Sequence, residues 1–233
     1  MLLPFELPIQ ILVCGSTGSG KSTLIRELIK RRHECLFPVP DKIYYFCKHE
    51  SSVDESIRNL VIIHVGLPKD DFFDNKDVNK HYLGVFDDLH TSCLNSEFVL
   101  NCVISGRHLN LSTIVVLHSL FPKAKFAREI SLNSRVLILF ANKRDGSQIF
   151  NLARQVCPLE SGFLSKVYFS YINTTSHSYI VIDCRESVKQ EFRFRTNIFD
   201  ESPIIFLSEK SVERLKNEKD TSAEAQLPFY QFL

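Results

Sequence analysis

Residues 9–23 read IQILVCGSTGSGKST, in which an apolar run leads into the pattern Gly-x-x-x-x-Gly-Lys-Ser. An amphipathic segment, residues 24–32, follows directly. This order predicts a strand, a phosphate-binding loop and a helix, which is the context in which the P-loop motif counts as evidence. A chance glycine-rich turn between a strand and a helix is the less favoured alternative.

Each residue type in this loop suits the binding of phosphate. The glycines allow the backbone to curl so that successive N–H groups face phosphate oxygens, and the helix adds the positive end of its dipole. Lys21 is expected to reach the β- and γ-phosphates, and the Ser22 hydroxyl to bind Mg²⁺. The pattern therefore predicts a nucleoside triphosphate site, formed by Gly15, Ser16, Thr17, Gly18, Ser19, Gly20, Lys21, Ser22 and Thr23.

The composition favours one ordinary α/β domain. The chain has 233 residues, of which 44% are hydrophobic and 24% are charged. Its net charge is +1, so any contact with DNA must come from a local patch or from several subunits together. The seven cysteines lack the spacing of a zinc site and indicate a reducing compartment, and neither a signal peptide nor a membrane span is expected.

Apolar runs separated by helical segments predict a mainly parallel sheet with helices on both faces. Polar residues 69–80 predict a surface loop or a short helix. The strands are expected at residues 42–47, 59–65, 82–88, 113–117, 135–141, 166–171 and 179–183, and further helices at residues 98–104 and 147–156.

The composition changes near residue 208, where a charged segment begins that ends in an aromatic one. We therefore expect a nucleotide-binding domain over residues 1–207 and a tail over residues 208–233. One interpretation of the tail is a short helix followed by a frayed terminus. The other is that its final aromatic segment, residues 227–233, docks on a partner or a neighbouring subunit.

Two acids, Asp87 and Asp88, end one predicted strand. Ligands of open α/β sheets lie beyond the carboxyl ends of the strands, so this pair is expected beside the P-loop if the two strands are neighbours. Asp87 would hold Mg²⁺ through water, and Asp88 would polarise the water that attacks the γ-phosphate. Adjacent like charges are a poor structural choice at a half-buried site, which disfavours a plain loop.

The segment Asn142-Lys143-Arg144-Asp145 offers a rival interpretation, because Asn-Lys-x-Asp is the guanine-recognition sequence of GTPases. A GTPase also needs Asp-x-x-Gly at the second strand end, where this chain has His90 or Thr91 at the glycine position. A small-molecule kinase is less favoured still, since no arginine-rich lid is evident.

Beyond the P-loop, an ordered set of segments resembles the FtsK–HerA superfamily. The closest likeness is to genome-packaging ATPases of poxvirus-like, adenovirus-like and Maverick/Polinton-type double-stranded DNA viruses. It covers roughly residues 8 to 200. The matching segments are residues 15–22, Asp87-Asp88, residues 106–112, Leu120-Phe121, residues 128–133, residues 142–145 with Gln148, residues 152–155 and residues 194–199.

The resemblance implies a RecA/FtsK–HerA-like P-loop fold and an ATP-driven motor. Such a motor forms a homo-oligomeric ring and pumps double-stranded DNA, without regard to sequence, into a preformed capsid. The implied cofactors are ATP and Mg²⁺, with Lys21 and Ser22 at the phosphates and the metal, Asp87 at the metal and Asp88 as the catalytic acid. The implied partners are capsid or portal proteins and no membrane, at virion assembly sites in the host nucleus or cytoplasm.

Two further roles follow from the resemblance. The position after the fourth strand is usually a glutamine that senses the γ-phosphate, and here it is His118, which could equally be a packed histidine. Ring motors also complete each site with an arginine of the next subunit, for which Arg107 is the first candidate. The alternative arginines are Arg128, Arg144 and Arg154, and the possible DNA contacts are Lys123, Lys125, Arg128, Lys143 and Arg144. A non-catalytic nucleotide-binding assembly protein remains a further alternative.

Overall fold

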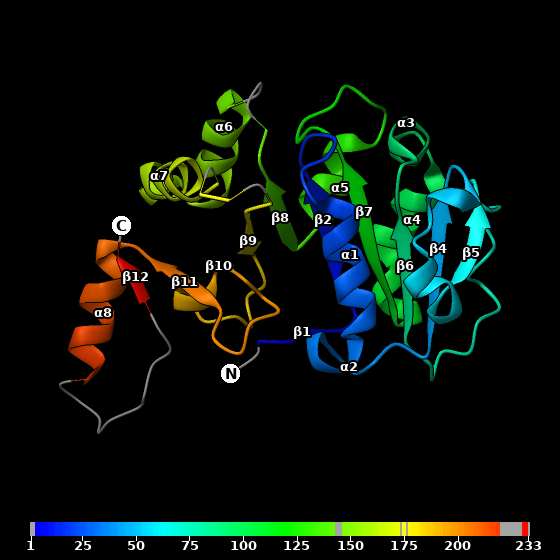
Figure 1. The fold of residues 1–233 in the computed structure, drawn as a ribbon, viewed down its shortest axis with the longest axis horizontal. Coiled ribbons are helices and arrows are strands. Elements are labelled where there is room, and N and C mark those ends of the chain that lie inside the picture. Colours follow the sequence, from blue (N-terminus) through cyan, green and yellow to red (C-terminus); the bar gives the residue numbers. More distant parts are fainter. Residues whose placement is uncertain (1–2, 143–145, 173, 176, 220–229, 233) are drawn as a thin grey trace.

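The computed structural model describes residues 3–142, 146–172, 174–175, 177–219 and 230–232. Within this part of the chain, ten strands form one sheet in the order β12-β11-β10-β9-β8-β2-β7-β6-β4-β5 (Figure 1). Their bounds are β2 Gln10–Cys14, β4 Lys42–Cys47, β5 Ile62–Val65, β6 Tyr82–Phe86, β7 Leu111–Leu117, β8 Val136–Phe140, β9 Tyr179–Asp183, β10 Phe194–Thr196, β11 Ile204–Leu207 and β12 Tyr230–Phe232. A separate parallel pair joins β1 Phe5–Glu6 to β3 Leu36–Phe37.

The sheet has a parallel half and a mostly antiparallel extension. Strands β5, β4, β6, β7, β2 and β8 all run parallel to their neighbours. Strand β9 then runs antiparallel to β8, and β10 and β11 continue in the same alternating manner. The carboxyl ends of the parallel strands therefore share one edge with the amino end of β9. The predicted mainly parallel sheet is confirmed.

Helices cover both faces of the sheet, as predicted. In Figure 1, α1 crosses the front of the sheet while α4 and α5 lie behind it. The α-helices are α1 Lys21–Lys30, α2 Arg32–Cys35, α3 His90–Leu94, α4 Glu97–Ser105, α5 Ala127–Asn133, α6 Gly146–Val156, α7 Ser161–Tyr171 and α8 Glu209–Lys219. The 3₁₀ turns are η1 Glu50–Ser52, η2 Glu55–Leu60, η3 Gly106–Leu109, η4 Pro158–Glu160 and η5 Gln190–Phe192. Within the described residues, no helix is long and apolar enough to span a bilayer.

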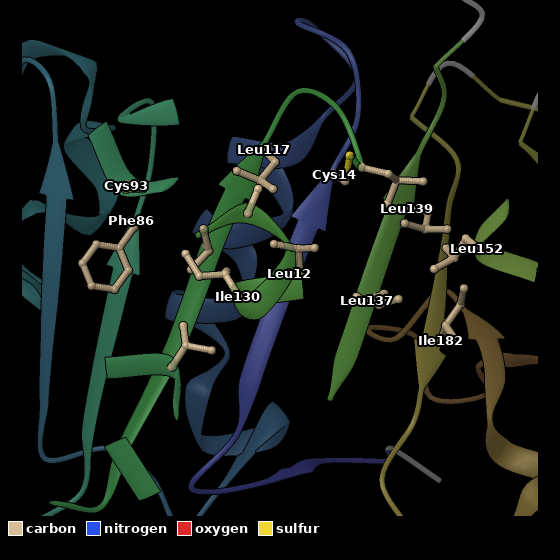
Figure 2. Packing of buried hydrophobic residues seen from close by; sticks show 14 of the residues in the cluster. Leu12, Cys14, Phe86, Cys93, Leu117, Ile130, Leu137, Leu139, Leu152 and Ile182 are labelled. Atoms are coloured by element: carbon tan, nitrogen blue, oxygen red, sulfur yellow. The ribbon is translucent and has the colours of Figure 1, made fainter. Parts of the chain in front are cut away.

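Alternation along the central strand β2 divides the core into two clusters. Ile11 and Val13 pack with the apolar side chains of α1. Leu12 and Cys14 face the other side, where Figure 2 shows them with Ile130 of α5 and with leucines of β7 and β8. Because both faces of β2 are buried, the strand that carries the P-loop is fixed from both sides.

One predicted strand was wrong. Residues 166–171 belong to α7, in which Leu164, Val167 and Tyr168 are buried at helical spacing. Their β-branched and aromatic composition resembles that of a strand, but the apolar positions recur with the period of a helix. Another prediction was too long, because η2 occupies residues 55–60 and β5 begins only at Ile62.

The segment at residues 69–80 contains turns and, in the described residues, neither a helix nor a strand. Its two phenylalanines nevertheless belong to the structure's aromatic core. Phe72 and Phe73 meet the ring of Tyr44 edge-on, at centroid distances of 5.3 and 5.5 Å. This polar loop is therefore attached to the sheet by its two apolar residues.

The described part of the tail contains a helix and a short strand. A helix, α8, follows β11 as expected, but β12 pairs in parallel with β11 of the same chain. Docking of residues 227–233 on a partner or a neighbouring subunit stays a prediction. Residues 220–229 and 233 lie outside the described residues.

A buried ion cluster joins the strands of the antiparallel extension. Asp183, at the end of β9, is 1% exposed, and Arg195 on β10 is 2% exposed. The Asp183 Oδ2 atom accepts hydrogen bonds from Arg195 Nη2 at 2.9 Å and from Arg185 Nη2 at 2.8 Å. Burial raises the pKa of Asp183, but its hydrogen bonds and the charges of the two arginines outweigh burial and hold it below 3.8.

We predict that Arg195→Met lowers the free energy of unfolding by about 3 kcal/mol, because it leaves a buried carboxylate with one partner fewer. Since the pKa of Asp183 is lower when folded, its stabilising effect is present above about pH 4 and is lost as the pH falls. Urea denaturation at pH 7 and at pH 3 measures both effects. The control is Lys125→Met in the exposed Lys125–Glu97 pair, which should cost less than about 1 kcal/mol. Equal losses in the two variants would contradict the prediction.

Candidate active site at the carboxyl edge of the parallel strands

The P-loop connects the end of β2 to the start of α1 and is held by the two neighbouring strands. Gly15 N donates to Leu117 O of β7 at 3.2 Å, and Ser16 N donates to Ala141 O, just after β8, at 3.3 Å. Gly15 must be a glycine, since a Cβ there would lie 2.5 Å from Phe140 Cβ. Gly20, with φ 106°, takes a left-handed conformation that favours glycine.

Lys21 lies inside the curl of the loop. Its Nζ atom donates to the carbonyl oxygens of Gly15 at 2.7 Å and of Ser16 at 2.8 Å. Burial lowers the pKa of Lys21, and the charges of Asp87 and Asp88 oppose that shift. The other loop residues differ in exposure. Ser16, Thr17 and Gly18 are exposed, Ser19 is buried, Gly20 is half-buried, and Ser22 and Thr23 are exposed on the first turn of α1.

The acidic pair lies beside the loop, although β7 separates β6 from β2 in the sheet. The Ser22 hydroxyl donates to Asp87 Oδ2 at 3.3 Å. Asp88 is exposed and has φ 55°, a left-handed conformation that is uncommon outside glycine and that an aspartate tolerates. Backbone strain of this kind clusters at functional sites. The structure thus brings together Lys21, Ser22, Asp87 and Asp88.

Tyr45 is a member of this site that the sequence analysis missed. Its hydroxyl donates to Asp87 Oδ2 at 2.6 Å from strand β4, which pairs with β6. Burial and the nearby Asp87 carboxylate raise the pKa of Tyr45, so the phenol remains protonated and donates. No local pattern could have identified it, because Tyr44 and Tyr45 are adjacent and only the face of the strand distinguishes them.

His118 follows β7 directly and lies between the P-loop strand and the strand of the acidic pair. Its ring meets that of His90, at the start of α3, with the centroids 5.1 Å apart. Burial, then the charges of Lys21 and His90, lower the pKa of His118, and Asp88 and Asp87 oppose this. The Nδ1 atoms of both rings are buried and have no partner among the described residues.

The lowered pKa of His118 and its buried, unpartnered Nδ1 atom both favour a neutral ring with the proton on Nε2. Protonation of Nδ1 would bury an N–H without an acceptor, which costs free energy. Gln148 of α6 holds the segment after His118, since its Oε1 accepts from Leu120 N at 2.9 Å. With that tautomer, His118 would offer a neutral N–H donor at the position where the resemblance expected a glutamine amide.

Three of the four arginines implied by the resemblance, Arg107, Arg128 and Arg154, lie among the described residues. Arg107 is exposed on η3, immediately before β7, and therefore at the edge opposite its own P-loop. Arg128 and Arg154 are exposed on α5 and α6. Arg144, and with it most of the Asn142-Lys143-Arg144-Asp145 segment, lies outside the described residues. Of the three candidates among the described residues, Arg107 is the one that the strand direction places away from its own P-loop.

No family model matches this chain, and no curated protein is similar to it in sequence. Among solved structures, it is similar to the genome packaging NTPase B204 of Sulfolobus turreted icosahedral virus 2 in complex with AMP. That match has a TM-score of 0.50 at 14% identity, and it covers 81% of this chain and 95% of the other.

The structure of B204 from Sulfolobus turreted icosahedral virus, described as a DNA-packaging ATPase, gives the same TM-score, 0.50, at 13% identity. It covers 77% of this chain and 94% of that protein. The fold of this chain is therefore that of P-loop NTPases of the RecA/FtsK type. The resemblance found in the sequence is confirmed at the level of the fold.

We predict that the His118 imidazole titrates below its ordinary value of 6.5 and is neutral at pH 7, with the proton on Nε2. Since the pKa is lowered, the charged form appears only as the pH falls below that value. Long-range ¹H–¹⁵N NMR correlations of the imidazole measure both the pKa and the tautomer, and a His118→Gln variant identifies the signals. A pKa above 7, or a proton on Nδ1, would disprove this description of the site.

Proposed function

We propose that this protein is an ATPase of the FtsK–HerA superfamily that forms a homo-oligomeric ring and moves double-stranded DNA into a viral capsid. The observation that carries the proposal is the meeting of the P-loop with the acidic pair, where Ser22 Oγ lies 3.3 Å from Asp87 Oδ2. The similar fold of B204, named as a genome packaging NTPase, supports the direction of the proposal. The capsid or portal proteins and the host-cell assembly site belong to the same proposal.

Ser22 and Asp87 would hold Mg²⁺. A hydroxyl and a carboxylate are the hard oxygen ligands that this ion prefers, and the two already lie within hydrogen-bond distance of each other. When bound, the ion neutralises charge that develops on the phosphoryl oxygens. Tyr45 would keep Asp87 Oδ2 in place through its 2.6 Å hydrogen bond.

The remaining residues divide the work of hydrolysis. Lys21 would leave the carbonyl oxygens of Gly15 and Ser16 for the β- and γ-phosphates, which are stronger acceptors because they are charged. Asp88 would orient the attacking water and accept its proton. His118 would donate its Nε2–H to a γ-phosphate oxygen.

A ring would explain the position of Arg107 and the low net charge. Arg107 lies at the far edge from its own P-loop, so it can assist hydrolysis only at the site of a neighbouring copy. Mixing Arg107→Ala with Asp88→Asn subunits should then restore part of the activity, and no rescue at any ratio would exclude this finger. Exposed Lys123, Lys125 and Arg128, summed over several copies, would contact DNA phosphates without reading sequence.

We predict that the purified protein hydrolyses ATP in preference to GTP and turns over faster with long linear duplex DNA. Asp88→Asn should bind ATP but lower turnover by about 10² or more, because it removes the base, and Lys21→Ala should abolish hydrolysis. The stimulation by DNA should fall steeply between about 50 and 200 mM salt. A steady-state phosphate-release assay and native mass spectrometry provide the measurements.

The matched control is Asp74→Asn, since Asp74 is an exposed acid of the loop at residues 69–80 and should leave turnover unchanged. A monomer whose turnover is indifferent to DNA would rule out the motor and leave only an NTPase. A preference for GTP would instead favour the GTPase interpretation.

Tyr45→Phe should weaken the apparent affinity of the nucleotide-bound protein for Mg²⁺ by about tenfold, because Asp87 loses the group that orients it. Nucleotide affinity in EDTA should not change. Titrating Mg²⁺ against the binding of a non-hydrolysable ATP analogue gives both values. Tyr44→Phe is the control, since Tyr44 faces the opposite side of the sheet. Identical Mg²⁺ affinities in the wild type and Tyr45→Phe would show that the hydrogen bond has no such role.

A further inference from the structure

The site fixes the direction in which a bound nucleotide must lie. Strands β7 and β6, with the acidic pair, flank β2 on one side, and β8 and β9 flank it on the other (Figure 1). Hydrolysis requires the γ-phosphate to lie toward Asp87, Asp88 and His118. The β- and α-phosphates then extend along the P-loop, away from the two acids and His118. The ribose and base therefore lie on the opposite side of the loop, near the end of β8 and the start of β9.

His177 occupies that side of the loop. It lies two residues before Tyr179, the first residue of β9, which pairs with Phe140 at the end of β8. Its Nδ1 atom lies 3.3 Å from Ser19 O of the P-loop. A Cβ on Gly20 would be 3.2 Å from both the Cβ and the Nδ1 of His177. The imidazole is therefore in contact with the loop, and yet the residue is exposed.

The surrounding residues hold His177 in this position. Ser178 is 5% exposed, and its hydroxyl accepts from Thr175 N at 3.1 Å and lies 2.7 Å from the Thr175 hydroxyl. The ring of Tyr179 packs on Phe140 at a centroid distance of 5.4 Å. Phe140 also lies beneath the loop, where its ring is 3.2 Å from the Cβ position of Gly20. The position of His177 beside the loop is thus fixed by Ser178 and Tyr179, the two residues that follow it.

We infer that His177 is the base platform of the site, on which the purine of a nucleoside triphosphate held by the P-loop stacks. The inference rests on the proposed function only in requiring that the P-loop binds a nucleotide. An imidazole is planar and exposed here, and every base offers a π-face to it. His177 therefore contributes affinity without choosing between adenine and guanine.

The test separates binding of the base from binding of the phosphates. AMP-PNP, GMP-PNP and inorganic tripolyphosphate, each with Mg²⁺, compete against a fluorescent nucleotide on the full chain. His177→Ala should weaken AMP-PNP and GMP-PNP by the same factor, about fivefold or more, which is the lower limit for loss of a base-stacking aromatic. Tripolyphosphate, which has no base, should bind with unchanged affinity.

Two variants make the result specific to stacking. His177→Phe keeps a planar ring and should retain the affinity for both nucleotides. His108→Ala removes an exposed histidine on η3, at the opposite edge of the sheet, and should change none of the three affinities. Thermal denaturation of each variant confirms that it is folded.

The other outcomes overturn the inference. An equal loss for tripolyphosphate would make His177 a support of the loop rather than a base platform. If His177→Ala lost affinity for only one of the two nucleotides, His177 would recognise that base through a hydrogen bond to its edge rather than by stacking. If it lost affinity for neither, His177 would not be part of the nucleotide site. If the wild type bound none of the three ligands, the proposed function itself would fail. If it bound them without hydrolysing ATP, the affinities of the wild type and His177→Ala could still be compared, and the inference could still be tested.

Discussion

The parallel pairing of β2 with β7 and β8 is the constraint on which this structure depends. The P-loop is attached to the ends of both neighbours, through Gly15 N to Leu117 O and Ser16 N to Ala141 O. The pairing of β6 with β7 then brings Asp87 to the same edge. Because side chains alternate along a strand, a slip of one residue in β6 would turn Asp87 to the other face of the sheet and away from Ser22.

The site gathers charges that would be unfavourable without a ligand. A buried ammonium group and two adjacent carboxylates lie close to two imidazoles whose Nδ1 atoms are buried. Loop carbonyls and the Tyr45 hydroxyl satisfy part of this polarity. A triphosphate with a metal ion would satisfy more, since it brings anionic oxygens to Lys21 and a cation to Asp87. Much of the free energy of binding under the proposed function would thus come from groups already fixed by the fold.

The sequence predicted the features that depend on neighbours along the chain. The P-loop, the strand before Asp87-Asp88 and the apolar strand before His118 are each recognisable within ten residues. Each is present, although β6 ends at Phe86 and the two acids follow it. It failed for residues 166–171, where strand-forming residue types follow a helical period. It also missed Tyr45 and His177, which meet the site from 42 and 158 residues away, because only the assembled sheet brings them there. The pairing of β12 with β11 had no local signal for the same reason.

The antiparallel extension gives the nucleotide site its second side. Asp183 lies at the carboxyl end of β9, where its buried carboxylate accepts hydrogen bonds from Arg195 on β10 and from Arg185. A buried carboxylate that loses its partners is costly, so the register of β9 against β8 and β10 is strongly specified at this point. The other end of the same strand carries Ser178 and His177 to the P-loop. The ion pair at the far end of β9 therefore helps to set the register that brings His177 to the P-loop, the side chain proposed to meet the base. The parallel strands place the residues proposed to act at the γ-phosphate.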